Sequence, residues 1–229
     1  MSKIRFDEEP ADMPPMEFPP EATSERPKVV KKPNGEAPQE SLPRPIGETA
    51  FSLLERNLPP LVRWCDPWAT EGLNIIAGRP KLGKTTLERQ KLAAAATASS
   101  FLDSTFPNAV KCAFLSLEEG PRLCRYKFQK AGFSEQATSG IALFFEWPRG
   151  EVGIFQLDRY LEENTEVKVV VIDSLTKFRS VPDPRSPSFS ADYEAVSALH
   201  NITNKYPGVC IDVVHHTRKM KGDDPIDSI

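Results

Sequence analysis

Several features that would define a function are scarce in this sequence. Its four cysteines are far apart and form no C-x-x-C pair, so neither a structural zinc site nor a disulfide framework is indicated. No stretch approaches the roughly 18 apolar residues that a membrane-spanning helix requires. The acidic N-terminus is interrupted by prolines and does not resemble a signal peptide. We therefore expect no membrane segment and a cytoplasmic location.

The sequence also lacks an excess of positive charge. It has 29 lysines and arginines against 32 aspartates and glutamates, a formal net charge of -3. This balance argues against a protein that coats nucleic acid by bulk electrostatics, so any DNA contact must come from local basic loops. Hydrophobic residues make up only 39% of the 229 residues, which suggests that part of the chain is not folded.

The unfolded part is predicted at the N-terminus. Residues 1–45 hold ten of the 22 prolines and show almost no periodic apolar pattern. This composition predicts a disordered, proline-rich tail that serves as a linker or as a docking segment for a partner. The remaining residues, 46–229, are enough to bury a core and are expected to form one domain.

A glycine-rich motif opens that domain. Residues 78–85 read G-R-P-K-L-G-K-T and fit the pattern G-x-x-x-x-G-K-[ST], which is typical of a phosphate-binding loop. The apolar residues 73–77 before it predict a buried strand, and residues 86–96 after it predict a helix without glycine or proline. The dipole of that helix would point its positive end at the phosphates.

Each part of this loop has an expected role. The glycines let backbone N–H groups turn toward the phosphates, Lys84 reaches the outer phosphates, and Thr85 offers its hydroxyl to magnesium. The candidate nucleotide-binding residues are Gly78, Arg79, Pro80, Lys81, Leu82, Gly83, Lys84, Thr85 and Thr86.

Strands and helices are predicted to alternate beyond the loop. Further strands are expected at 111–117, 141–145, 167–172 and 209–214, and further helices at 121–131, 153–161 and 192–206, with a short lead-in helix at 48–56. The run V-K-V-V-V-I at 167–172 is typical of a strand buried on both faces. The alternation predicts an α/β fold with a mostly parallel sheet flanked by helices.

Carboxylates follow two of these strands. Asp173 ends the valine-rich strand and is a candidate magnesium residue, directly or through water, with Ser174 as an alternative contact. ATP hydrolysis also needs a group that activates water, and many ATPases place a glutamate directly after the magnesium aspartate, where this chain has Ser174. We therefore expect the base to be Glu118 or Glu119 at the end of another strand, and favour Glu118 because it follows the apolar run more closely.

Two histidines end the last predicted strand. His215 and His216 are adjacent, so their side chains point to opposite faces of the strand and do not suggest a zinc site. His216 is expected to contact the γ-phosphate and act as a switch, while His215 packs against the sheet. The nearest string to the guanine-binding N-K-x-D lacks the aspartate and precedes a strand, which favours ATP over GTP.

Four motifs together resemble those of one family. They are A-G-R-P-K-L-G-K-T-T at 77–86, L-S-L-E-E at 115–119, V-I-D-S-L at 171–175 and V-H-H-T-R-K at 214–219. With them, residues 61–229 resemble the RecA-like P-loop ATPases of the AAA_25 group, which contains the RepA-type hexameric replicative helicases. The resemblance implies a RecA-like P-loop NTPase core and a Mg²⁺-dependent ATPase, in which Lys84, Glu118 or Glu119, Asp173 and His216 perform catalysis.

The resemblance also implies partners. Family members form rings with ATP between subunits, and an arginine from the neighbouring copy completes each site. Loops after the magnesium strand and the sensor strand face the channel and grip single-stranded DNA. The candidate DNA-binding residues in these loops are Lys177, Arg179, Arg185, Arg218, Lys219 and Lys221, although such residues are also ordinary surface charges.

One departure from the family qualifies this expectation. The sequence stops at Ile229, where a further strand and the segment supplying the arginine are expected. The domain would then be truncated, or the protein would not be a complete motor, with Arg218 as the fallback for the arginine. The leading hypothesis is a DNA-replication helicase or related DNA-dependent ATPase. The alternatives are a nucleotide-dependent scaffold or loader without unwinding activity and, with less support, a small-molecule kinase.

Overall fold

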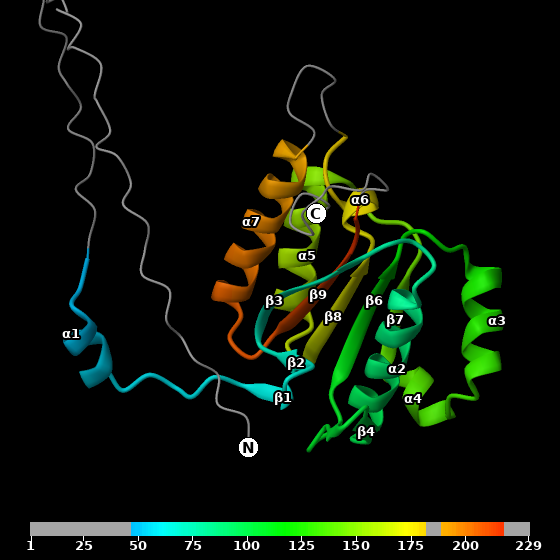
Figure 1. Cartoon of the computed structure of the whole chain (residues 1–229), viewed down its shortest axis with the longest axis horizontal. Helices are drawn as coiled ribbons and strands as arrows, with labels where there is room; N and C mark the ends of the chain where they lie inside the picture. The colour runs from blue at the N-terminus through cyan, green and yellow to red at the C-terminus, as the bar shows by residue number, and fades with distance from the viewer. Residues whose placement is uncertain (1–46, 182–188, 218–229) are drawn as a thin grey trace, which may run out of the picture. The chain divides into compact units, whose positions relative to one another are not determined.

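A five-stranded parallel sheet forms the centre of the molecule (Figure 1). The structure is a computed structural model that describes residues 47–181 and 189–217. In spatial order the strands are β3 (Gly72–Gly78), β9 (Cys210–His216), β8 (Val167–Asp173), β6 (Lys111–Ser116) and β7 (Ile141–Phe144). Every neighbouring pair is parallel, so all five strands end at the same edge of the sheet.

Helices cover both faces of this sheet. One face carries α2 (Lys84–Thr97), α3 (Pro121–Ala131) and α4 (Glu135–Ser139), and the other carries α5 (Gly150–Glu163), α6 (Leu175–Phe178) and α7 (Ser190–Lys205) (Figure 1). A separate cluster of buried apolar side chains fills the space on each face. Strand β8 contributes to both clusters because alternate valines point to opposite faces. The arrangement confirms the α/β, RecA-like core predicted from the sequence.

The boundaries of the elements follow local sequence signals. Helix α3 begins at Pro121, where a missing N–H is tolerated, and its C-cap Gly132 has a φ of 67°, as the predicted helix 121–131 required. The sequence did not indicate α4, α6 or four short strands, which are β1 (Arg63–Cys65), β2 (Ala69–Thr70), β4 (Ser100–Phe101) and β5 (Ser104–Thr105). Within the described ranges, the structure contains no helix of the length and apolarity needed to cross a membrane.

Helix α1 (Ala50–Glu55) is a separate unit of the chain and is described by itself. The Thr49 hydroxyl caps it by accepting a hydrogen bond of 3.1 Å from the Ser52 N–H. Its apolar side chains are exposed, with Phe51 at 74% and Leu54 at 81%. The lead-in helix expected at 48–56 is therefore present, while the tail predicted for residues 1–45 lies outside the described residues.

Three charged side chains are buried between α2 and β9. Lys91 Nζ lies 2.8 Å from Glu88 Oε2 and 2.8 Å from Asp212 Oδ2, and none of the three side chains is more than 3% exposed. Burial, with the Asp212 carboxylate acting in the same direction, raises the pKa of Glu88 to about 8 despite the opposing effect of Lys91. Two carboxylates thus share one ammonium group, and a proton on Glu88 makes the cluster neutral.

We expect Glu88→Gln to flatten the pH dependence of folding stability. The pKa of Glu88 is raised on folding, so its contribution to the free energy of unfolding is present below pH 4.5 and is lost as the pH rises toward 8. Between pH 5 and pH 9 the free energy of unfolding of the unmodified protein should fall by on the order of 3 kcal/mol more than that of the variant. Urea unfolding across this range measures the difference, and the exposed Glu162→Gln is the control. Parallel pH curves for the protein and Glu88→Gln would contradict this assignment.

Candidate functional site

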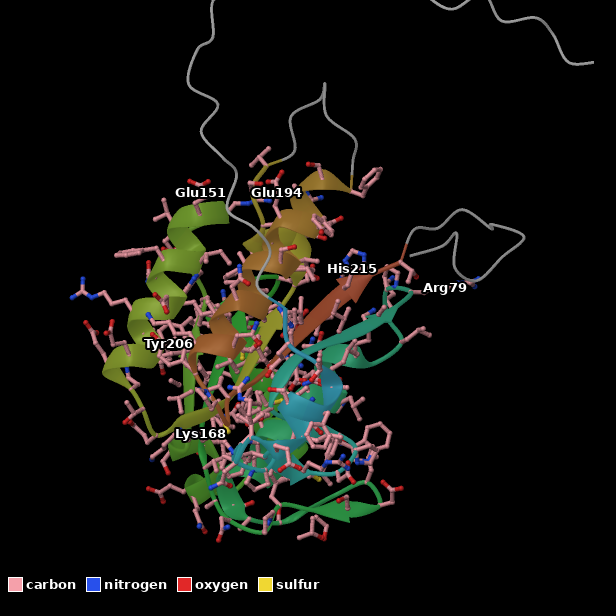
Figure 2. All side chains as sticks on the ribbon, turned by 90° about the vertical axis from the view of Figure 1, so that its left-hand side faces the viewer. Arg79, Glu151, Lys168, Glu194, Tyr206 and His215 are labelled. Atoms are coloured by element: carbon pink, nitrogen blue, oxygen red, sulfur yellow. The ribbon has the colours of Figure 1, made fainter. Side chains whose placement is uncertain are left out.

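The glycine-rich motif forms a loop between the end of β3 and the start of α2. Gly83 has a φ of 89°, a left-handed conformation that glycine adopts without strain, and Lys81 also has a positive φ of 68°. Because α2 begins at Lys84, the unpaired N–H groups of its first turn lie beside the loop and favour an anion there. Figure 2 shows Arg79 of this loop at the same end of the sheet as His215 of β9.

The loop residues differ in exposure. Lys84 is 9% exposed, Gly78 and Thr85 are half-buried, and the other positions of the loop are exposed. The exposed residues of the loop and the first turn of α2 are Arg79, Pro80, Lys81, Leu82, Gly83 and Thr86.

Lys84 connects the loop to the end of β9. Its ammonium group donates to the carbonyl oxygens of Gly78 at 2.7 Å and Arg79 at 2.9 Å. It also lies 3.1 Å from Nδ1 of His216. Burial lowers the pKa of Lys84, while the charges of Asp173 and Glu118 act in the opposite direction. The cation is thus held between the loop and two acidic strand ends.

Asp173 ends β8 beside the first turn of α2. Its side chain is buried, and Oδ1 has no hydrogen-bond partner among the described residues. Burial raises the pKa of this carboxyl, and the Thr85 side chain partly offsets the increase. A buried carboxylate oxygen without a protein partner, next to a hydroxyl, is a donor set that Mg²⁺ prefers. The residues present therefore fit a magnesium ion.

The two consecutive glutamates have different partners. Glu118 accepts a hydrogen bond from the Ser174 hydroxyl through Oε1, and its Oε2 lies 3.3 Å from Nε2 of His216. Glu119 instead forms ion pairs with Arg89 of α2 and Lys127 of α3. Glu118 therefore lies near Lys84 and His216. Glu119 is instead paired with the two neighbouring cations, Arg89 and Lys127.

The two histidines at the end of β9 lie on opposite faces. His216 faces α2, where it lies between Lys84 and Glu118. His215 lies on the side of α6 and α7, where burial lowers its pKa and Asp192 opposes that effect. Their positions agree with the alternation expected for adjacent strand residues.

Two of the candidate DNA-binding residues lie in the described part of the chain. Lys177 is exposed in α6, one residue before the end of that helix. Arg179 is not free at the surface, because its Nε lies 2.5 Å from Asp192 Oδ1 and its side chain is only 13% exposed. Arg185, Arg218, Lys219 and Lys221 lie outside the described residues.

Sequence reasoning missed two residues that shape this site. Ser174 was considered only as an alternative magnesium contact, and Arg89 only as part of a predicted helix. Arg89 is buried, pairs with Glu119 and lies over the Phe114 ring at 5.6 Å. No local pattern signals either contact, because each joins residues that are at least 30 positions apart.

Comparisons with known proteins give one family and several structures. A family model described as an AAA domain, AAA_25, matches residues 38–222. A crystal structure of the RadB recombinase is similar, with 21% sequence identity and a TM-score of 0.45, over 66% of this chain and 63% of that chain. A structure of a DnaB-like replicative helicase is similar with 15% identity and a TM-score of 0.46, over 69% and 42% of the two chains. This chain thus spans less than two thirds of either protein. Among curated proteins, none matches.

We expect the two glutamates to differ in their effect on stability. Glu119→Gln leaves the guanidinium of Arg89, which is 3% exposed, without its anionic partner and should lower the free energy of unfolding by about 2–3 kcal/mol. Glu118 is 35% exposed, so Glu118→Gln should cost less than about 1 kcal/mol. Urea unfolding at pH 7 compares the variants, and equal losses would contradict the separation of the two side chains.

Proposed function

The chain belongs to the AAA_25 family of AAA domains, and from this premise we propose that it is a Mg²⁺-dependent ATPase of DNA replication. One observation carries the proposal. Lys84, Glu118 and His216 come from three different segments and form a continuous set of contacts at the carboxyl edge of the sheet. Asp173, whose charge acts on Lys84, ends the strand beside them.

In this proposal the loop and α2 bind the triphosphate. Backbone N–H groups around Gly83 contact phosphate oxygens, and Lys84 neutralises charge on the outer phosphates. The Thr85 hydroxyl and the Asp173 carboxylate would hold Mg²⁺. When bound, the ion supplies positive charge against the negative charge that develops on the phosphate oxygens during transfer.

Glu118 is the proposed base. It orients a water molecule and accepts its proton while the water oxygen bonds to the γ-phosphorus and the bond to the ADP oxygen breaks. The ion pairs of Glu119 with Arg89 and Lys127 support Glu118 over its neighbour for this role. His216 touches both Lys84 and Glu118, which supports its role as the residue that responds to the γ-phosphate.

We further propose that the protein works as a ring of identical copies on single-stranded DNA. Membership of the AAA_25 family supports this assembly. Among the residues that the structure describes, the exposed Lys177, three residues after Ser174, is the best candidate for contact with the phosphate backbone of DNA. Native mass measured with ATP and Mg²⁺, with and without single-stranded DNA, tests both the ring and the DNA partner. A monomer under all these conditions would exclude the ring.

A strand-displacement assay tests the helicase activity itself. We expect turnover that is stimulated by single-stranded DNA and coupled to separation of a duplex. Stimulated turnover without strand separation would favour a nucleotide-dependent scaffold or loader instead.

Lys84→Ala should abolish ATP hydrolysis while leaving the fold intact. The variant loses the cation that neutralises the outer phosphates, so turnover should fall by at least about 100-fold. A coupled assay of phosphate release measures it, with circular dichroism to verify folding. Lys130→Ala, which removes an exposed lysine from α3, is the matched control. Retained turnover in Lys84→Ala would count against the proposed site.

Glu118→Gln should separate binding from chemistry. The amide keeps the shape of the side chain but cannot take a proton, so kcat should fall by about 100-fold or more, with ATP affinity within about threefold of the unmodified protein. Equilibrium binding of a fluorescent ATP analogue and single-turnover hydrolysis measure the two quantities. Normal turnover in this variant would transfer the role to Glu119.

A further inference from the structure

The Ser174 hydroxyl does not cap the helix at whose start it lies. Ser174 occupies the N-cap of α6, where a serine oxygen usually accepts a hydrogen bond from an N–H of the first helical turn. In the described part of the chain its side chain makes no such bond, and the hydroxyl instead donates to Oε1 of Glu118. The Ser174 carbonyl accepts from the N–H groups of Lys177 at 3.0 Å and Phe178 at 3.1 Å. The start of α6 therefore does not depend on the hydroxyl.

Backbone pairing fixes the distance between Ser174 and Glu118. Ser116 and Asp173 are partners in the parallel pairing of β6 with β8. One step further, the Leu117 N–H donates to the Asp173 carbonyl at 2.8 Å. The serine and the glutamate follow directly after this bond on their two strands. Because Ser174 is 0% exposed, water does not compete for its hydroxyl.

The second oxygen of Glu118 is also bound. Oε2 lies 3.3 Å from Nε2 of His216, so both ends of the carboxylate have a partner and its plane is fixed. Burial raises the pKa of Glu118, but the hydrogen bonds from Ser174 and His216 outweigh it and bring the pKa below the usual range. The other charged groups that act on this carboxylate are Lys177 of α6, Lys84 of α2 and Asp173 of β8.

We propose that Ser174 is a positioning residue for the water-activating carboxylate, and that its hydroxyl holds Glu118 ionised beside Lys84 and His216. The inference rests on the proposed hydrolysis and gives a role to a residue that neither binds phosphate nor exchanges a proton. It differs from a magnesium contact in what it predicts, because the Ser174 hydroxyl donates to Glu118 and its loss should change the titration of the base rather than the Mg²⁺ requirement. It differs from a capping role, because the first turn of α6 closes through the backbone.

Ser174→Ala in the full chain tests this role through steady-state kinetics. Loss of a hydrogen bond to the ionised form raises the pKa of the base. The acidic limb of the kcat profile should therefore move to higher pH. At pH 7, kcat should fall by about tenfold, with the KM for Mg·ATP within about twofold. Ser174→Thr keeps the hydroxyl and should recover most of the turnover.

Ser116→Ala is the matched control. Ser116 is 1% exposed and lies two residues before Glu118 in the same chain segment, and its hydroxyl has no hydrogen-bond partner among the described residues. Its removal should leave the acidic limb unchanged. A raised Mg²⁺ requirement in Ser174→Ala, with an unmoved acidic limb, would overturn the proposal and identify Ser174 as a magnesium contact.

A second measurement does not depend on turnover. Carbon-13 NMR of the side-chain carboxyl groups follows the titration of Glu118 in the full chain, and Glu118→Gln assigns its signal. The midpoint should lie at higher pH in Ser174→Ala than in the unmodified protein. An unchanged midpoint together with unchanged kcat would overturn the inference. If the unmodified protein hydrolysed no ATP, the proposed function would fail, and the titration alone would still decide whether Ser174 acts on Glu118.

Discussion

Parallel backbone pairing is the constraint on which the candidate site depends. Gly78 is paired with His216, and Asp173 is paired with both Val214 and Ser116. These pairs bring the ends of four strands to one edge, so the side chains that follow the strands approach each other there. A shift of one residue in any of these registers would turn the functional side chain to the opposite face of the sheet. The geometry of the candidate site therefore depends on the valine-rich and isoleucine-rich strands that fix the registers.

Helix α2 combines two ways of packing against this sheet. Near its C-terminal end, alanines and Leu92 join an apolar cluster. On the side of β9, Lys84 contacts His216, and two turns later Lys91 binds Asp212. Burying charges costs solvation energy that an apolar contact does not, so these pairs are a weak source of stability. They do specify one position of the helix along β9, because each cation has a partner at only one level of the strand.

The sequence predicted the parts of this structure that have local causes. The run of β-branched residues at 167–172 indicated β8, and proline and glycine marked both ends of α3. The strand ends also gave Asp173 and the glutamate pair as candidates. The sequence favoured Glu118 over Glu119 only by its place after the apolar run. The contacts that separate the two side chains involve Arg89 and Ser174, which only the fold brings near. The burial of Lys91 was not predictable either. In a helical segment rich in good helix formers, a buried lysine cannot be told from an exposed one by sequence alone.

The contact between Lys84 and His216 has a consequence for the imidazole ring. An ammonium group can only donate hydrogen bonds, so Nδ1 of His216 must be the acceptor and the ring hydrogen resides on Nε2, facing the carboxylate of Glu118. The hydrogen bonds then run in one direction, from the Lys84 cation through the ring to the Glu118 carboxylate. The tautomer of a single histidine thus sets the direction of the whole chain of contacts.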